Sequence, residues 1–188
     1  EEDDVVIRYR LHNAQVCMCH KCWLPKRKKA ITFLSRNKEA AAKFTSLFTE
    51  HAINKFYLAI SNAKPKKKQG WIKGDMAKSR RGMFKLLPTL QNPAITRFYS
   101  FSYKPGFRAY ILKPYSGKTH QLRVALKSLG APILGDTLYS GSAAERAYLH
   151  AYALSFLWHG EQINCSLLPT TGDEYQQLIN HQEFQSWQ

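Results

Sequence analysis

The sequence predicts an α+β protein with a mixed, mostly antiparallel sheet flanked by a few helices. Three observations lead to this class: short segments alternate apolar and polar residues, turns containing Gly or Pro separate them, and few stretches have a helical period. At 188 residues and 44% hydrophobic composition, the chain can bury a core and fits one domain. We therefore expect a single domain over residues 1–188.

Helices are expected where apolar residues recur every three or four positions, and strands where they alternate. The helical segments are residues 37–48, about 119–129, and 173–184. The strand segments are residues 5–7, 56–60, 94–102, 108–112, 149–158 and 162–168. Residues 62–70 indicate a loop, and residues 71–87 a hairpin with a basic turn at 78–82. Gly130 suits the left-handed backbone that ends a helix.

The charge balance indicates a polyanionic partner. Lys and Arg number 28 against 13 acidic residues, which gives a formal net charge of +15. Four of those acids are residues 1–4, so the remaining chain is still more basic. Nucleic acid is the commonest intracellular polyanion, and the clustering of the basic residues favours it over a generally cationic surface.

The ends and apolar runs bear on location. The acidic start EEDDVVI is unlike a secretory signal or a transit peptide, and no apolar run is long enough to span a bilayer. We expect a cytoplasmic protein without membrane contact. The abrupt start is consistent with a protein that lacks a further N-terminal domain, or with a fragment.

Three of the four cysteines fall within residues 17–22, in the pattern Cys-x-Cys-His-x-Cys. Cys and His are zinc ligands, but tetrahedral sites usually take their ligand pairs from separate turns. Here the three cysteines and the single histidine are crowded into one short stretch. The other interpretations are an RNA-binding loop and a damaged copy of a different sequence. We expect no metal, and we expect Cys165, in an alternating apolar stretch, to be a small buried side chain.

Residues 115–141 carry the most specific motif in the chain, YSGKTHQLRVALKSLGAPILGDTLYSG. This stretch closely resembles the third motif of the RluA-type RNA pseudouridine synthases, G-[RK]-T-H-Q-[LI]-R-V. Residues 55–59, 92–96 and 149–151 resemble further motifs of the family, K-x-Y-x-A, K-P-A-x-T and L-H-A. The resemblance covers about residues 31–170 and leaves residues 8–30 anomalous.

The resemblance implies the pseudouridine synthase catalytic-domain fold and isomerisation of uridine to pseudouridine in structured RNA, either rRNA or tRNA. In this family the uracil is detached at the C1′–N1 bond, rotated and reattached through C5, without cofactor or metal. A uridine buried in RNA structure must first be flipped out. A monomer is expected.

The resemblance also implies roles for individual residues. Arg123 matches the family's arginine that pairs with the catalytic Asp, and a guanidinium can hold a carboxylate through two hydrogen bonds. Tyr57 matches the tyrosine that contacts the base. The remaining candidates for substrate binding are Lys118, Thr119, His120, Gln121, Leu122, Lys78, Arg80 and Arg81.

Several of these candidates have structural alternatives. His120 and Gln121 can bind the active-site loop or a phosphate, or cap the helix start. Leu122 is expected in the wall of the pocket. Lys78 and its neighbours on the hairpin turn contact phosphate or form a solvated loop. Asp136 is expected to be a hydrogen-bonding turn residue rather than the catalytic acid, because it lies in a different family motif.

The family's nucleophilic Asp, in the motif H-[RK]-L-D-x-x-T-[ST]-G, is absent. None of the five aspartates of the chain is preceded by the His-Arg/Lys-Leu of this motif. The five are Asp3, Asp4, Asp75, Asp136 and Asp173. Counting back from residues 31–34 places Pro25 at the Asp position, and two extra residues place Trp23 there instead. The family's first motif is also missing, so the chain lacks a normal N-terminal part. Residues 8–30 are either a frame-shifted segment or natural divergence.

Two functions are therefore open. The chain is an active RluA-type synthase, or it is an inactive homologue that keeps the fold and acts in RNA binding or ribosome assembly. The resemblance favours the first, and the missing Asp favours the second.

Overall fold

The computed structural model describes residues 7–11, 14–19, 30–35 and 38–186. The strands are β1 (Ile7–Leu11), β2 (Ala14–Cys19), β3 (Ala30–Ser35), β4 (Asn54–Ser61), β5 (Gln69–Gly74), β6 (Met76–Lys78), β7 (Phe84–Leu86), β8 (Ala94–Lys104), β9 (Phe107–Pro114), β10 (Leu149–Trp158) and β11 (Glu161–Ser166). The helices are α1 (Lys38–Thr49), α2 (Gln121–Ser128), α3 (Asp173–Ile179) and α4 (Gln182–Gln185), with 3₁₀ helices η1 (Arg80–Gly82) and η2 (Thr137–Tyr139). Pro25 and Trp23, the positions aligned with the catalytic Asp, lie outside the described residues.

The predicted α+β class is confirmed. The central sheet has six strands in the order β11-β10-β4-β9-β8-β5, and the ladders β4–β9, β8–β9, β5–β8 and β10–β11 are antiparallel. The chain divides into two compact units, which we describe separately. The first unit comprises Glu1–Lys55 and His150–Leu167, and the second unit comprises Phe56–Leu149 and Leu168–Gln188. The single domain expected over residues 1–188 stays a prediction.

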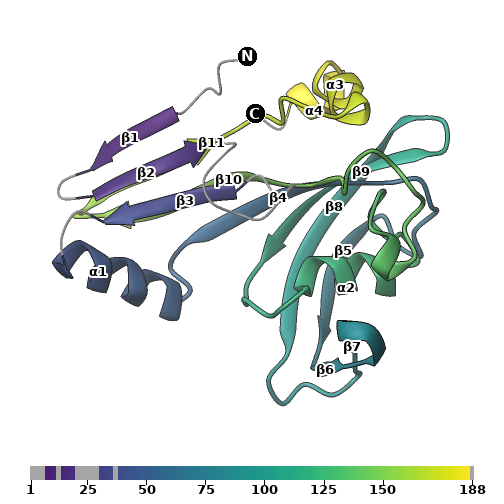
Figure 1. Ribbon diagram of the computed structural model, residues 1–188, viewed down its shortest axis with the longest axis horizontal. Helices are drawn as coiled ribbons and strands as arrows, with labels where there is room; N and C mark the ends of the chain where they lie inside the picture. Colours follow the sequence, from purple (N-terminus) through teal and green to yellow (C-terminus); the bar gives the residue numbers. More distant parts are fainter. Residues whose placement is uncertain (1–6, 12–13, 20–29, 36–37, 187–188) are drawn as a thin grey trace. The chain divides into compact units, whose positions relative to one another are not determined.

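The first unit contains a three-stranded antiparallel sheet, β1-β2-β3, with α1 beside β3 (Figure 1). The apolar stripe of α1 buries Ala40 and Phe44, as the helical period predicts. Phe44 stacks on Trp158 with ring centroids 4.4 Å apart. The same core includes Cys165, whose side chain is 2% exposed, and burial raises the pKa of its thiol to about 11. Cys165 is therefore the small buried side chain that its sequence context predicts.

The second unit is built on strands β4, β9, β8 and β5, and α2 lies against β8 and β7 (Figure 1). Along β8, Ala94, Thr96 and Phe98 are buried while Arg97 and Tyr99 are exposed. Successive side chains of a strand point to opposite faces, so this alternation identifies the face that α2 covers. None of the described helices is long and apolar enough to cross a membrane.

Tight turns confirm most of the predicted element boundaries. His159 and Gly160 join β10 to β11, and both have positive φ (48° and 86°), as a two-residue type I′ hairpin requires. Pro105 and Gly106 join β8 to β9, with Gly106 at φ 76°. Gly130 follows α2 with φ 76°, which is the left-handed helix end predicted for it.

The prediction that residues 71–87 form one hairpin is wrong, because its two strands do not pair with each other as expected. Strand β5, which contains Trp71, pairs with β8, and a separate small hairpin forms between β6 and β7. The break comes at Gly74, where a Cβ atom would lie 2.2 Å from the backbone oxygen of Leu87. The close approach of these two backbone segments therefore requires glycine and ends β5 before the small hairpin begins.

Candidate active site

Arg123 and Asp136 form the central ion pair of the second unit. The Nε and Nη2 atoms of Arg123 donate hydrogen bonds to the two carboxylate oxygens of Asp136, at 2.8 and 2.6 Å. The side chains are 19% and 5% exposed, so the pair is largely removed from water. The hydrogen bond to Asp136 raises the pKa of the guanidinium, and its planar fork is fixed in one orientation.

Local backbone geometry holds Asp136 in place. The preceding residue, Gly135, has φ 80°, and the backbone oxygen of Asp136 accepts hydrogen bonds from the N–H groups of Tyr139 and Gly141. Gly141 is also required by space, because a Cβ there would lie 1.9 Å from the backbone oxygen of Ile133. Asp136 has the hydrogen-bonded turn position predicted for it, and in addition it supplies the carboxylate for Arg123.

Tyr139 connects three parts of this site. Its ring lies 4.6 Å from the guanidinium carbon of Arg123. Its hydroxyl accepts a hydrogen bond from the backbone N–H of Phe84, at 2.9 Å, and lies 2.8 Å from Nδ1 of His120. The hydroxyl and His120 Nδ1 share one hydrogen bond, whose donor is set by the tautomer of the imidazole. Tyr139 thereby joins the ion pair, the start of α2 and strand β7.

Gln121 has all four of its hydrogen-bonding positions occupied within the protein. Its Oε1 accepts from the Ser116 hydroxyl and the Lys118 backbone N–H, each at 2.9 Å. Its Nε2 donates to the backbone oxygen of Ile95 and to the Thr96 hydroxyl, each at 3.0 Å. The side chain is 6% exposed, so these contacts favour a structural role over the RNA contact that the sequence predicted.

The side chain of His120 does not cap the start of α2, which was one of the two roles considered for it. His120 precedes α2 with φ 57° and makes no side-chain hydrogen bond to the helix start. The Lys118 N–H at this end is bound instead by the Gln121 side chain. Leu122 is 8% exposed and packs inward, whereas Thr119 is exposed.

Replacement of Gln121 by Met is expected to lower the free energy of unfolding by about 2 kcal/mol. The substitution removes one acceptor and two donors, and it leaves buried groups of the Ser116–Lys118 turn and β8 unpaired. Urea unfolding followed by circular dichroism measures this loss. The matched control is Gln162→Met on β11, where the side chain is exposed and a change within about 0.5 kcal/mol is expected. Equal losses in both variants would contradict the role of Gln121.

Tyr57 lies on β4, on the sheet face that α2 covers. It pairs with Leu112 of β9, which in turn pairs with Phe98 of β8. Leu112 and Phe98 are buried at 0% and 3%, on the same side as Thr96, which Gln121 contacts. Burial raises the pKa of the Tyr57 hydroxyl, which keeps it neutral.

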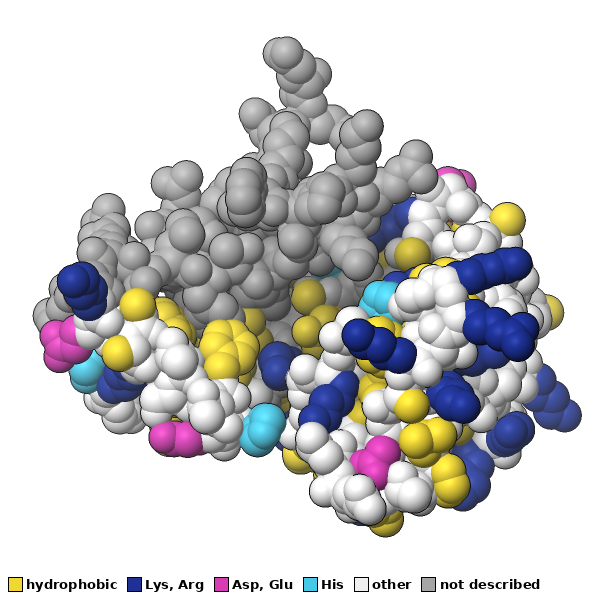
Figure 2. Space-filling view, turned by 60° about the horizontal axis from the view of Figure 1, so that its bottom comes forward, with side chains coloured by type: hydrophobic (Ala, Val, Ile, Leu, Met, Phe, Trp, Pro, Cys, Tyr) yellow, Lys and Arg dark blue, Asp and Glu magenta, His cyan; other side chains and the backbone are white. Residues whose placement is uncertain are grey.

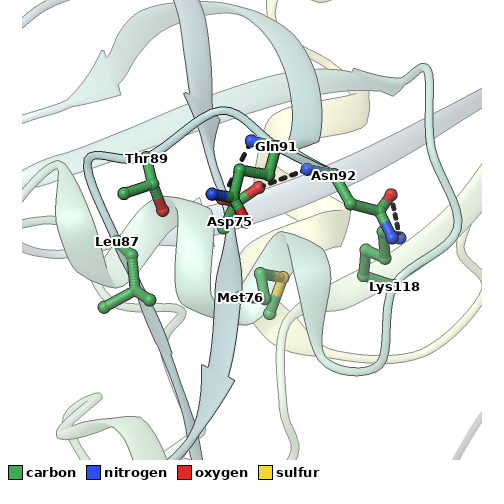
Figure 3. A pocket seen from close by; sticks show the side chains of 7 residues that line it. All are labelled: Asp75, Met76, Leu87, Thr89, Gln91, Asn92 and Lys118. Atoms are coloured by element: carbon green, nitrogen blue, oxygen red, sulfur yellow. Dashed lines mark hydrogen bonds between the residues drawn. The ribbon is translucent and has the colours of Figure 1, made fainter.

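A polar cavity of about 330 Å³ lies near the start of α2 (Figure 3). The carboxylate of Asp75 accepts hydrogen bonds from the backbone N–H groups of Gln91 and Asn92, at 3.0 and 2.8 Å. These bonds hold the loop that lines the rim of the cavity. Hydrogen bonds from Thr89 and then Gln91 hold the pKa of Asp75 below its usual value. The Nζ of Lys118 donates to Oδ1 of Asn92 at 2.7 Å, which orients the ammonium group into this cavity.

The basic residues predicted on a hairpin turn are exposed at the end of the small β6–β7 hairpin. Lys78 ends β6, and Arg80 and Arg81 form η1, with Arg81 at φ 55°. Figure 2 shows this end of the second unit with many Lys and Arg side chains and few acidic ones.

Sequence reasoning missed the partner of Arg123 and the role of Tyr139. Both Asp136 and Tyr139 belong to the segment PILGDTLY, so the family motif already contained the signal. Sequence reasoning also gave no role to Asp75, whose carboxylate accepts hydrogen bonds from the backbone of Gln91 and Asn92. In the part of the chain that the structure describes, no three His, Cys, Asp or Glu side chains converge into a metal-binding cluster.

Comparisons with known proteins identify the relatives of this chain. Residues 31–128 match the RNA pseudouridylate synthase family. The chain is 54% identical over 158 residues to an "Uncharacterized RNA pseudouridine synthase" of Haemophilus influenzae, covering 81% of this chain and 70% of that protein. It is 30% identical over 152 residues to "Ribosomal large subunit pseudouridine synthase C" of Rickettsia bellii, where it spans 50% of the relative's length.

The fold is also found in a solved structure. Human RNA pseudouridylate synthase domain containing 1 superposes with a TM-score of 0.72, covering 93% of this chain and 88% of that chain. At 19% sequence identity this likeness concerns the fold alone. The family match begins at residue 31, where the motif comparison expected it. With the motif around Arg123 folded as described, these matches show that the chain belongs to the RNA pseudouridine synthase family.

Proposed function

We propose that this protein binds structured RNA and that RluA-type isomerisation of uridine to pseudouridine is the reaction for which its fold is built. The observation that carries the proposal is the orientation of Arg123. The guanidinium is fixed within the third family motif, on the sheet face that also presents Tyr57. In this family the corresponding groups act on the catalytic carboxylate and on the base.

Exposed cations near this site support the binding of RNA. Arg80 and Arg81 present two guanidinium groups on the small hairpin, and Lys118 presents an ammonium group at the cavity rim. Tyr139 ties the hairpin to α2 through its contacts with Phe84 N–H and His120. Phosphate contacts of this kind position an RNA while the flipped uridine enters a pocket.

Ribosomal RNA is the first substrate class to test, and transfer RNA the second. The Rickettsia bellii relative is named for the large ribosomal subunit, which supports this order. The proposed reaction breaks the C1′–N1 bond, rotates the uracil and joins its C5 to C1′ of the same nucleotide. The proton on C5 is released and N1 takes up a proton, so no cofactor is needed. We further propose that the protein acts as a monomer in the cytoplasm.

A second function, RNA binding without isomerisation, is favoured by the identity of the partner of Arg123. Asp136 lies in the third motif, its side chain is 5% exposed, and Arg123 binds both of its carboxylate oxygens. A carboxylate buried in this way is poorly placed to reach a ribose. Asp136 gives the buried Arg123 guanidinium a carboxylate partner, so burying its charge does not destabilise the fold. Asp136 does not thereby supply a nucleophile. In this case the protein would bind RNA during ribosome assembly.

RNA binding is expected to be retained and salt-sensitive, with weak or absent isomerisation. Affinity for ribosomal and transfer RNA transcripts is measured across a salt series, and isomerisation by release of tritium from uridine labelled at C5. Arg80→Gln/Arg81→Gln is expected to reduce the slope of log K against log salt by roughly 1.5, because two phosphate contacts are lost.

The matched control is Lys38→Gln/Lys43→Gln on α1, which removes the same charge and is expected to reduce the slope less. No RNA binding even at low salt would overturn the proposal. Isomerisation at the rate of an active synthase would remove the second function. Equal effects of the two double variants would remove the hairpin from the RNA-binding surface.

A further inference from the structure

An exposed cluster of aromatic and basic side chains lies on strands β5, β8 and β9 of the second unit and at the end of β9. We call it the sheet patch, and its members are Trp71, Lys73, Arg97, Lys113 and Tyr115. The rings of Trp71 and Tyr115 are in contact, with centroids 5.1 Å apart. The Nζ of Lys73 lies 5.1 Å from the Trp71 ring, and the Nζ of Lys113 lies 5.1 Å from the Tyr115 ring.

The strand register places the sheet patch on the face opposite α2. Trp71 of β5 pairs with Arg97 of β8, which pairs with Lys113 of β9, so the three form one row across the sheet. Arg97 lies between the buried residues Thr96 and Phe98, which point toward α2. Since neighbouring residues of a strand point to opposite sides, this row faces away from Tyr57 and Arg123.

The sheet patch is open to solvent. Trp71 is 50% exposed and Tyr115 is 38% exposed, which is unusual for large aromatic side chains that lie together. Its border is marked by Tyr99, whose hydroxyl donates to Glu183 of α4 at 2.8 Å. All the charged members of the sheet patch are cations, so its charge complements a polyanion.

We propose that the sheet patch binds a single-stranded segment of RNA, with bases stacked on Trp71 and Tyr115 and phosphates held by Arg97, Lys73 and Lys113. Aromatic rings interleaved with cations form stacking surfaces for single-stranded nucleic acid that need no particular sequence. This surface is distinct from the Arg123 face. The inference rests on the proposed function only in that the chain binds RNA.

The spacing of the strands suits this partner. Neighbouring strands lie about 4.8 Å apart, so Trp71 and Lys113, two strands apart, are separated by roughly 10 Å. That distance accommodates a stacked base together with its flanking phosphate. A single-stranded segment that continues from a structured RNA would thus reach the sheet patch on the face opposite Arg123. Because the two contacts belong to one RNA molecule, the second contact increases the overall affinity.

Trp71→Ala is expected to weaken binding of single-stranded oligouridylate, eight nucleotides long, by about tenfold. Trp71→Phe retains a stacking ring and is expected to keep most of the affinity. Binding is measured by fluorescence anisotropy of the labelled oligonucleotide. Quenching of tryptophan fluorescence is compared between the unaltered protein and Trp71→Phe, so that the difference reports on Trp71 alone.

The matched control is Phe48→Ala on α1, which removes another exposed aromatic residue with a lysine, Lys55, near its ring. Unchanged binding in Trp71→Ala, or equal weakening in Phe48→Ala, would overturn the inference. Circular dichroism of each variant checks that the fold is kept. We expect it to be kept in the Trp71 variants, because this side chain is half exposed.

The outcome also separates this inference from the proposed function. If Arg80→Gln/Arg81→Gln weakens RNA binding and Trp71→Ala does not, only the sheet patch loses its role. If the unaltered protein binds neither oligouridylate nor structured RNA, the proposed function fails as well. If Trp71→Ala instead abolishes self-association in sedimentation, without changing RNA affinity, the surface is a protein interface and the inference is wrong.

Discussion

Asp136→Ala is expected to lower the free energy of unfolding by about 3 kcal/mol, because it leaves the Arg123 guanidinium without its carboxylate. The side chain of Asp136 is 5% exposed and that of Arg123 is 19% exposed, so water replaces the lost hydrogen bonds only in part. Urea unfolding monitored by circular dichroism measures the loss. The guanidinium would also lose its fixed orientation, so the substitution tests the element on which the proposed function rests.

The double variant Arg123→Ala/Asp136→Ala completes the thermodynamic cycle. Its loss of stability is expected to be smaller than the sum of the two single losses, because neither charge then remains buried alone. Asp173→Ala is the control: this residue is exposed at the start of α3, and a loss within about 1 kcal/mol is expected. Additive losses in the double variant would mean that the pair is not energetically coupled.

Gly135→Ala is expected to destabilise the protein by about 4 kcal/mol, a large fraction of the roughly 5–15 kcal/mol that stabilises a typical domain. Two costs combine at this position. The backbone has φ 80°, which disfavours any side chain, and a Cβ would lie 1.8 Å from the backbone oxygen of Arg146. Relief of that contact would shift the turn that carries Asp136 and thereby disturb its bonds with Arg123.

Gly130→Ala provides a matched comparison, because the two glycines share a left-handed backbone. Gly130 has φ 76°, but the nearest atom to its Cβ would be the Lys64 oxygen, at 3.9 Å. Only the conformational cost of about 1 kcal/mol then remains. Thermal unfolding of both variants measures the difference. Similar melting temperatures would show that the turn before Asp136 yields more easily than the backbone contact indicates.

Elements whose signals are local agreed well with the sequence. Helix α1 is described over Lys38–Thr49, in agreement with the helix expected over residues 37–48, whose first residue lies outside the described part. Gly130 ends α2 with the left-handed backbone predicted for it. The β10–β11 turn at His159 likewise follows from local backbone preferences. Such features depend on neighbouring residues, which a single sequence displays directly.

Pairings between distant segments could not be obtained in the same way. The alternating stretch around Trp71 predicts a strand, but it does not say whether that strand pairs with residues 84–86 or with β8. The folded chain also brings the backbone of Leu87 against Gly74, where only glycine leaves space for it. Register is set by contacts across the sheet, and these are absent from local pattern.

The candidate site divides along the same line. The resemblance identified Arg123 and Tyr57, and it noted the segment that contains Asp136. It treated Asp136 as a turn residue alone, because the guanidinium was expected to meet a carboxylate from another motif. The structure brings Asp136 to Arg123 through a turn closed by Gly135 and Gly141.

The sequence by itself determined the fold class, the basic character of the chain and the family, since these follow from composition and from residue types at fixed local spacing. Only the tertiary structure decided which carboxylate binds Arg123, how Gln121 uses its polar atoms, and that Trp71 shares one sheet face with Arg97. Those three outcomes depend on turn closure and strand register, which are set when segments far apart in the sequence pack together.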